Sequence, residues 1–308
     1  MRVAVMAAGA MGGYFGGRLA EIGHEVHFIA RGANLAALRQ NGLRVKSSLG
    51  DLHIAKPNVT DDPKTIGIVD VVLFTVKLWD VETAGALIKP LTGPDTRVLS
   101  MLNGIDSVDR LAPILGGGVV AACPTQISAV IESPGVILHK AVDPTFACGF
   151  MDGRDDARLK SLVDQMQGAK FKARYSREAE ADLWRKFIFL VGMSGSTAGL
   201  RATLGEIRED PDTLAVLQGL MREVEAVGVK KGIPIAGHAE KAIGYAMAGA
   251  PGNKASMAED LARGNRLETD WLQGKVVELG KQLGVPTPVN RDIYAVLKLH
   301  RMGKSRAA

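Results

Sequence analysis

The first residues whose types and spacing suggest chemistry lie between Ala7 and Gly12, where the chain reads Ala-Ala-Gly-Ala-Met-Gly. Gly9 would let the backbone approach a pyrophosphate, and Gly12 would let a following helix lie close to the preceding strand. Met11 would begin that helix, directly after Ala10, and both residues are expected to bind the cofactor, because the free N–H groups of the helix start face the phosphates. The pattern predicts a dinucleotide-binding turn, although alanine at position 7 replaces the usual first glycine. A purely structural turn is the alternative, because glycine-rich turns often follow strands.

Three further polar residues follow predicted strands. Arg31 stands where NAD-binding proteins carry an acidic side chain for the ribose 2′-hydroxyl; a guanidinium suits a 2′-phosphate and favours NADP(H). Lys77 would supply a second positive charge for the 2′-phosphate. Asn103 would face the nicotinamide end of the ligand crevice, which lies at the carboxyl ends of the strands. The structural alternatives are a surface arginine, a lysine extending into solvent and an ordinary Asn-Gly turn.

Short apolar runs in the first half of the chain predict the strands that must position these residues. Predicted strands cover residues 2–6, 25–30, 43–47, 52–55, 69–76, 98–102, 119–123, 136–140, 145–148 and 170–173. Predicted helices in this half cover 11–22, 33–40 and 155–167. The runs at 43–47 and 52–55 flank a Leu-Gly-Asp turn and indicate a hairpin.

After Tyr175 the strand-like runs stop and long helical patterns take over. Helices are expected over residues 178–200, 212–231, 238–248, 258–283 and 291–302, separated by glycine and proline. We therefore predict an α/β chain with two domains. Residues 1–174 would form an NADP-binding, Rossmann-type doubly wound parallel sheet, and residues 175–308 an all-helical domain for the substrate and for a possible homodimer.

Composition limits the classes of function. The 308 residues are 46% hydrophobic and 23% charged, with a net charge of +5, as in ordinary globular proteins. Basic and aromatic residues do not interleave, so no nucleic-acid partner is predicted. The basic C-terminal tail through Lys304 and Arg306 is interpreted as a solvated helix end. No apolar segment is long enough for a membrane helix, and no membrane partner is predicted.

Cysteine and histidine usage argues against metal and disulfide chemistry. Cys123 and Cys148 are the two cysteines, and neither they nor the six histidines have metal-ligand spacing. We therefore predict no metal and a cytoplasmic location, where thiols stay reduced.

Seven short segments, in this order along nearly the whole chain, resemble the ketopantoate reductase (2-dehydropantoate 2-reductase) family. They are Gly9-Ala10-Met11-Gly12-Gly13, Ile29-Ala30-Arg31-Gly32, Thr75-Val76-Lys77, Asn103-Gly104, Leu183-Trp184-Arg185-Lys186, Ser256-Met257-Ala258-Glu259-Asp260 and Leu267-Glu268. The resemblance implies NADPH-dependent reduction of a 2-oxo acid to a 2-hydroxy acid. Ketopantoate, reduced to pantoate for pantothenate biosynthesis, is the leading substrate.

The resemblance also implies roles for individual residues. Lys186 would be the general acid and would contact the substrate, with Glu268 as its partner. Ser256 would bind the substrate carboxylate, and Asn103 would line the nicotinamide and substrate site. Arg31 and Lys77 match the pair that binds the 2′-phosphate. Without the resemblance, Lys186 would be interpreted as a solvated side chain or as part of a salt bridge.

Ser256 has a second interpretation that needs no resemblance. The run from Ser256 to Glu259 predicts a capping box, with the serine at the N-cap. The helix that it opens would carry Glu268. Both roles of the serine are compatible.

The chain departs from the family at positions that would contact pantoate. Asparagines of the family fall at Leu190, Ser194 and Leu204 here, so that only Ser194 keeps a hydrogen-bonding group for the substrate. A buried polar contact to a substrate is worth about 1–3 kcal/mol. A more apolar 2-oxo acid is therefore the alternative substrate, and a non-catalytic NADP(H)-binding sensor is the alternative from another class.

Overall fold

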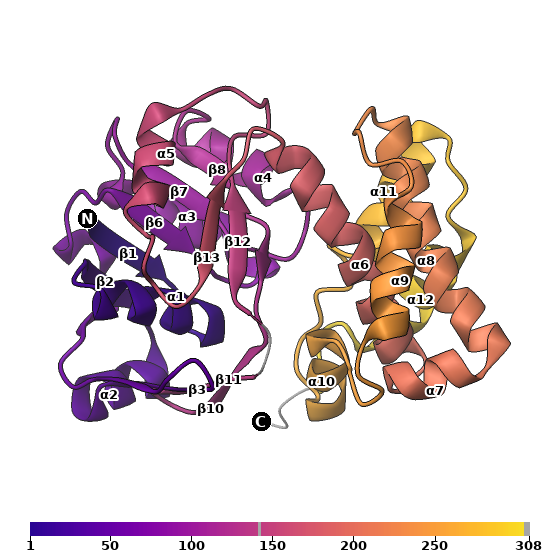
Figure 1. The fold of residues 1–308 in the computed structure, drawn as a ribbon, viewed down its shortest axis with the longest axis horizontal. Coiled ribbons are helices and arrows are strands. Elements are labelled where there is room, and N and C mark those ends of the chain that lie inside the picture. Colours follow the sequence, from indigo (N-terminus) through magenta and orange to yellow (C-terminus); the bar gives the residue numbers. More distant parts are fainter. Residues whose placement is uncertain (141–142, 305–308) are drawn as a thin grey trace. The chain divides into compact units, whose positions relative to one another are not determined.

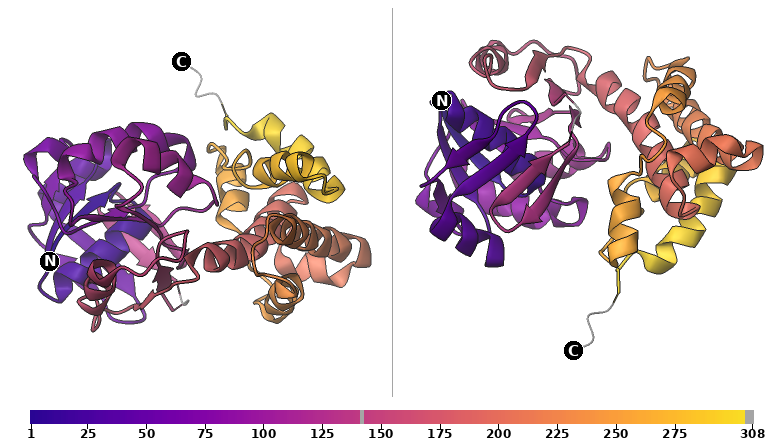
Figure 2. Two further views of the ribbon diagram at one scale, coloured as in Figure 1. Left: turned by 90° about the horizontal axis from the view of Figure 1, so that it is seen from above. Right: turned by 60° about the horizontal axis from the view of Figure 1, so that its bottom comes forward.

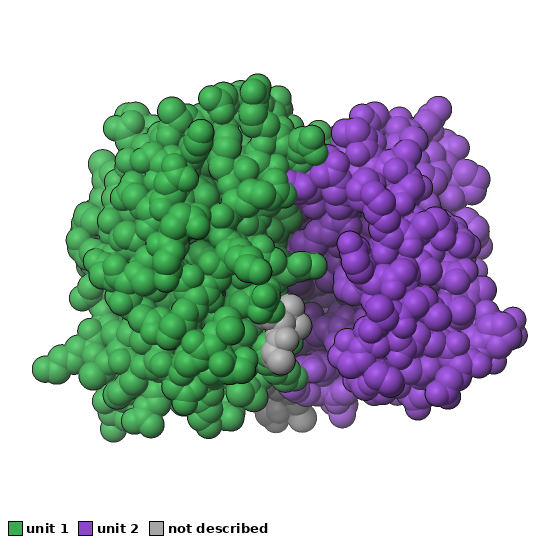
Figure 3. Space-filling view, viewed as in Figure 1, with its two compact units in different colours: residues 1–102, 106–180 green, residues 103–105, 181–308 purple. Residues whose placement is uncertain are grey.

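The computed structural model describes residues 1–140 and 143–304, so Arg306 of the basic tail lies outside the described residues. The chain divides into two compact units (Figures 1 and 3). The first contains Met1–Leu102 and Asp106–Glu180, and the second contains Asn103–Ile105 and Ala181–Ala308. The domain boundary after residue 174 stays a prediction.

The first unit is built on a parallel sheet of six strands (Figure 1). Its strands are β1 (Arg2–Met6), β2 (Glu25–Ile29), β5 (Asn58–Thr60), β6 (Val71–Phe74), β7 (Arg97–Ser100) and β8 (Val120–Ala122). Their order across the sheet is β5-β2-β1-β6-β7-β8. β5, the third strand of this sheet along the chain, therefore lies at one edge, and the direction of winding reverses between β1 and β6. This is the doubly wound Rossmann arrangement, and the predicted fold class is confirmed.

Two small sheets complete the strands of this unit. One has the order β10 (Ala129–Ser133), β11 (Val136–His139), β3 (Leu43–Ser47) and β4 (Leu52–Ile54); the other has the order β13 (Lys172–Tyr175), β12 (Thr145–Cys148) and β9 (Thr125–Gln126). β3 and β4 pair antiparallel, which confirms the predicted hairpin. β5, β9 and β10 were not predicted, because β5 and β9 are short and contain polar residues, and the apolar run that begins β10 is only three residues long.

The first helix of this unit, α1 (Ala10–Glu21), packs between two sheets. A Cβ atom at Gly16 would lie 2.6 Å from a methyl of Val5 in β1, and one at Gly13 would lie 2.2 Å from Ile137 in β11. Gly13 and Gly16 therefore permit close packing of α1 on both sheets. The other helices are α2 (Gly32–Asn41), α3 (Val81–Ile88), α4 (Ser107–Leu115) and α5 (Ala157–Asp164), with short 3-10 turns η1 (Pro63–Thr65), η2 (Leu78–Asp80) and η3 (Lys89–Leu91).

The second unit is helical in its described residues, and Figure 2 shows its helices from two further sides. They are α6 (Ala179–Gly199), which begins two residues before the unit, α7 (Leu204–Glu209), α8 (Pro211–Lys230), α9 (His238–Ala248), α10 (Ser256–Arg263), α11 (Gln273–Leu283), α12 (Pro288–Leu297) and η4 (Lys298–His300). Small residues let α6 approach its neighbours. A Cβ atom at Gly192 would lie 2.4 Å from Met221 in α8, and one at Gly199 would lie 2.9 Å from Ile293 in α12.

The single helix predicted over residues 258–283 is wrong. α10 ends at Arg263, and Gly264 follows in the left-handed region with a φ of +71°. The N–H of Asn265 then donates back to the Asp260 carbonyl, 2.8 Å away, which closes the helix end. α11 begins only at Gln273, so the intervening residues form a loop.

No described helix combines the length and apolar character needed to cross a membrane. Within residues 1–140 and 143–304, no group of three or more His, Cys, Asp or Glu side chains is arranged to hold a metal ion.

Candidate functional site

The turn after β1 has the shape that the glycine-containing pattern requires. Ala7 has a φ of +75°, in the left-handed region that glycine adopts without strain, which explains why glycine is usual there. The N–H of Ala8 donates to the Ile29 carbonyl of β2, 2.9 Å away, and the N–H of Gly9 donates to the Ala7 carbonyl, 2.8 Å away. The turn is therefore fixed against the carboxyl end of β2.

Gly12 is required by close packing behind this turn. A Cβ atom at Gly12 would lie 2.4 Å from the Ala7 carbonyl oxygen and 2.5 Å from Oγ1 of Thr75. Thr75 follows β6, and its hydroxyl lies within hydrogen-bonding distance of the carbonyl oxygens of Met6, at 2.9 Å, and Ala7, at 2.8 Å. The role of Thr75 was missed, because it depends on two strands that are far apart in the sequence.

Gly9, in contrast, leaves open space. A Cβ atom built on Gly9 meets no described protein atom within 4 Å, and its φ of −78° is open to any residue. The fold therefore does not need glycine at this position. Gly9 is the N-cap of α1, so the N–H groups of Ala10, Met11 and Gly12 begin the helix without carbonyl partners inside it. These features form a cradle that suits a phosphate.

Asn34 of α2 supports the same turn and was also missed from the sequence. Its side-chain amide donates to the Ala8 carbonyl, 2.8 Å away, and its Oδ1 accepts from the N–H of Gly135, 2.9 Å away. Asn34 thereby joins the turn after β1 to the loop before β11. No local sequence signal identifies it, since both of its partners are distant in the chain.

Arg31 and Lys77 lie at the carboxyl ends of β2 and β6, the two strands that pair with β1. Both residues are exposed. Nζ of Lys77 lies 5.7 Å from the ring centroid of Trp79. Ligands of doubly wound sheets bind at this edge, where the winding reverses. The structure thus places both positive charges at the edge that carries the phosphate cradle.

The second unit brings together two of the predicted site residues. Nζ of Lys186, on α6, donates a hydrogen bond to Oδ1 of Asn103 over 3.1 Å. Asn103 belongs to the three residues that group with the helical unit, and both side chains are half-buried. A charge-assisted bond of this kind restricts where the ammonium can lie.

Ser256 is exposed as the first residue of α10, and the predicted capping box is wrong. Ala255 is the N-cap, with extended backbone, and no side chain caps this helix. Ser256 is therefore the first residue inside the helix and not its N-cap. A capping box does occur in α7, where Thr203 and Glu206 bond each other's backbone N–H groups.

Glu268 lies in the loop between α10 and α11, not on the helix that Ser256 opens, so that expectation is wrong as well. The side chain is 8% exposed. The next residue, Thr269, donates through Oγ1 to Oε1 of Gln273, and Nε2 of Gln273 donates to the Val191 carbonyl of α6, each over 3.2 Å. This buried chain of hydrogen bonds connects the Glu268 loop to the helix that carries Lys186.

The three positions that depart from the resemblance are placed differently from one another. Leu190 is half-buried, whereas Leu204 is 1% exposed and packs near Gly249. Ser194 is also 1% exposed, and within the described part of the chain its hydroxyl has no hydrogen-bond partner.

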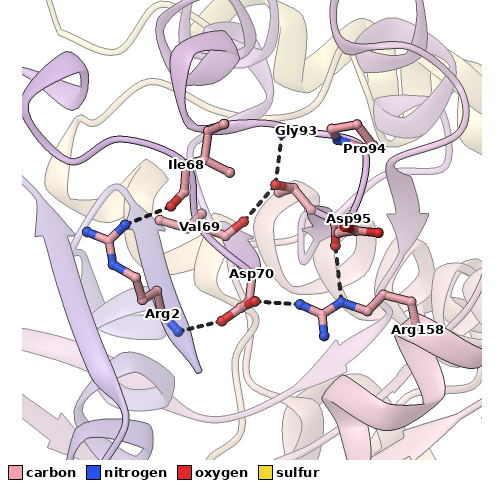
Figure 4. A pocket seen from close by; sticks show the side chains of 9 residues that line it. Arg2, Ile68, Val69, Asp70, Gly93, Pro94, Asp95 and Arg158 are labelled. Carbon is pink, nitrogen blue, oxygen red and sulfur yellow. Dashed lines mark hydrogen bonds and ion pairs between the residues drawn. The ribbon is translucent and has the colours of Figure 1, made fainter.

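A separate cavity of about 620 Å³ lies at the opposite, amino-terminal edge of the parallel sheet (Figure 4). The backbone N–H of Arg2 donates to Asp70 over 2.7 Å, and Arg158 forms an ion pair with Asp70. Burial tends to raise the pKa of Asp70, but these hydrogen bonds and the charge of Arg158 outweigh it and lower the pKa. The cavity is therefore lined by the amino-terminal ends of strands and by charged groups that already bond one another.

Comparisons with known proteins agree with this architecture. The family model described as ketopantoate reductase PanE/ApbA matches residues 3–153, and the model of its C-terminal part matches residues 178–301. An uncharacterised oxidoreductase of Bacillus subtilis (strain 168) is 28% identical over 311 residues, covering 99% of this chain and 100% of that protein.

Solved structures give the same result. A PanE/ApbA family ketopantoate reductase from Ralstonia eutropha JMP134 is 30% identical, with a TM-score of 0.89 and 98% of each chain covered. D-mandelate dehydrogenase, solved with NADH and anilino(oxo)acetate, is 22% identical with a TM-score of 0.89 over 98% of each chain, which shows a shared fold. The chain belongs to the PanE/ApbA family of ketopantoate reductases, which are NAD(P)-dependent oxidoreductases.

Proposed function

We propose that this protein reduces a 2-oxo acid to the corresponding 2-hydroxy acid with NADPH, and that ketopantoate is the first substrate to test. The observation that carries the proposal is the hydrogen bond from Nζ of Lys186 to Oδ1 of Asn103, 3.1 Å long. Asn103 follows a strand of the nucleotide-binding sheet by only three residues, so the bond ties the proposed acid to a segment that continues from the cofactor edge.

The nucleotide would be held by the first unit. The turn from Gly9 to Gly12 would bind the pyrophosphate, because the first N–H groups of α1, from Ala10 to Gly12, have no carbonyl partner inside the helix and a Cβ at Gly9 would occupy open space. Arg31 and Lys77 would bind the 2′-phosphate, which favours NADPH over NADH. When bound, the reduced nicotinamide would supply a hydride to the carbonyl carbon of the substrate.

Lys186 would supply the matching proton. Negative charge develops on the carbonyl oxygen during reduction, and an ammonium both stabilises that charge and protonates the oxygen. Asn103 would keep Nζ of Lys186 in place through the hydrogen bond already described. Glu268 would orient the lysine or the substrate from its anchored loop, and Ser256 would bind the carboxylate with its hydroxyl and the N–H groups at the start of α10.

A more apolar 2-oxo acid is the second candidate substrate. Leu190 and Ser194 replace amides that the family directs to pantoate, and the Ser194 hydroxyl is buried. D-mandelate dehydrogenase, which shares the fold, was solved with the aryl compound anilino(oxo)acetate. An aryl or branched-chain 2-oxo acid therefore belongs in the same test.

The test is NADPH oxidation by the purified full chain with ketopantoate, a branched-chain 2-oxo acid and an aryl 2-oxo acid, each repeated with NADH. Turnover with any of the three acids and a preference for NADPH support the proposal, and the ratio of kcat/KM values identifies the better substrate. NADPH binding without turnover of any of them would refute it and favour the non-catalytic sensor.

A further inference from the structure

Helix α6 carries more than the proposed acid. Thr197 lies eleven residues after Lys186, which is close to three full turns, so the two residues share one face of the helix. The part of α6 around Thr197 is buried, and the hydroxyl-bearing side chain itself is 1% exposed. A hydroxyl in such a place must find its hydrogen-bond partners inside the protein.

The Thr197 hydroxyl makes two hydrogen bonds. It donates to the Met193 carbonyl one turn earlier in α6, 2.6 Å away, and it accepts from the backbone N–H of Ala255, 3.2 Å away. Ala255 is the N-cap of α10 and directly precedes Ser256. Thr197 is thus a side chain through which α6 holds the start of α10.

We propose that Thr197 is a positioning residue that fixes Ser256 and the first N–H groups of α10 relative to Lys186. The proposal rests on the proposed function, in which these groups bind the carboxylate of a 2-oxo acid. The carboxylate and the carbonyl oxygen of such an acid are separated by a short, rigid spacing. The two groups that bind them must therefore keep a fixed separation, and the bond from Ala255 to Thr197 provides it.

The neighbouring Ser196 offers a matched control. It is also fully buried in α6, and its hydroxyl donates to the Gly192 carbonyl over 2.7 Å, the same backward bond that Thr197 makes. That hydrogen bond stays within α6, so Ser196→Ala removes a buried hydroxyl from the helix without releasing α10. A difference between the two positions therefore isolates the bond to Ala255.

The experiment compares Thr197→Val, Thr197→Ser and Ser196→Ala in the full chain, with NADPH and the best 2-oxo acid of the panel. For Thr197→Val we expect KM for the 2-oxo acid to rise on the order of tenfold, the effect of one lost hydrogen bond, with KM for NADPH unchanged. Thr197→Ser keeps the hydroxyl and should restore KM, and Ser196→Ala should leave it near the wild-type value.

Amide exchange at Ala255 gives a readout that does not depend on activity. Its N–H should be protected in the wild type and in Thr197→Ser, and should exchange faster in Thr197→Val. If Thr197→Val does not fold, Thr197→Ala replaces it in both assays.

An unchanged KM for the acid, an equal rise in KM for NADPH, or the same rise in Ser196→Ala would overturn the positioning role. If the wild type reduces no 2-oxo acid, the proposed function fails first and the positioning role falls with it. The exchange data would then show only whether the bond to Ala255 exists.

Discussion

Gly9→Ala separates binding from folding at the proposed phosphate cradle. The added methyl meets no described protein atom within 4 Å, and the φ of −78° is ordinary for alanine. If a pyrophosphate lies against this backbone, however, the methyl occupies its place. We therefore expect a variant that folds like the wild type and binds the dinucleotide poorly.

The expected change in stability follows from two opposing effects. Alanine restricts the unfolded chain and stabilises the fold by about 0.4–1 kcal/mol. Gly9 is the N-cap of α1, and alanine is worse than glycine there by roughly 0.5–1 kcal/mol. These effects nearly cancel, so the free energy of unfolding should change by less than about 0.5 kcal/mol. The Kd for NADPH should rise at least about tenfold, because the backbone can no longer approach the phosphates.

The assay is a thermal melt without nucleotide, followed by calorimetric titration with NADPH. Gly118→Ala is the matched control, because Gly118 lies in the same unit, its Cβ also meets nothing within 4 Å, and it is distant in sequence from the cradle. Wild-type affinity in Gly9→Ala, with a normal melt, would refute the placement of the pyrophosphate at this turn.

Three further outcomes are expected. Arg31→Ala should weaken NADPH at least about tenfold more than NADH in paired titrations, and equal losses would mean that Arg31 does not bind the 2′-phosphate. Ala7→Gly should raise the free energy of unfolding by about 0.5 kcal/mol in denaturant titrations, because relief of the left-handed strain exceeds the added entropy of the unfolded chain; a loss of stability would contradict this. Burial tends to raise the pKa of Asp156, but hydrogen bonds from Arg97 and the Leu159 N–H outweigh it and lower the pKa. The stabilisation is therefore present above the unfolded-state pKa, near the usual 3.8, and is lost as the pH falls through the folded-state value. Asp156→Asn should destabilise the protein by about 1 kcal/mol at neutral pH, with a difference that disappears in acid melts; a difference independent of pH would contradict the charge effect.

Much of the fold could be predicted because its signals are local. The β-branched run of β1 and the small residues after it predict a strand, a turn and a helix, and the structure has all three between Arg2 and Glu21. The helix boundary at Arg263 could not be predicted, since it depends on Gly264 adopting the left-handed region inside an otherwise helical pattern. The predicted capping box failed by one residue, because Ser and Glu at the right spacing do not determine which residue becomes the N-cap.

In the candidate site, too, residues with a local sequence signal could be predicted and residues that depend on distant contacts could not. Glycines, Arg31 and Lys186 belong to motifs that are contiguous in sequence, so the resemblance identifies them. Asn34 and the Thr269–Gln273 pair act through bonds to distant segments and leave no local pattern. Thr75 stands in one of the resembling segments, but its bond to the turn after β1 depends on a distant part of the chain. These supporting contacts become visible only once the chain is folded.

The most direct test of the central claim is the single-turnover rate of Lys186→Ala, measured beside its NADPH affinity, with the best 2-oxo acid of the panel. The account predicts an NADPH Kd within about twofold of the wild type and a rate at least about a hundredfold lower, because the ammonium acts only on the reacting oxygen. A rate near that of the wild type, in a variant that binds NADPH normally, would contradict the assignment of Lys186 as the general acid.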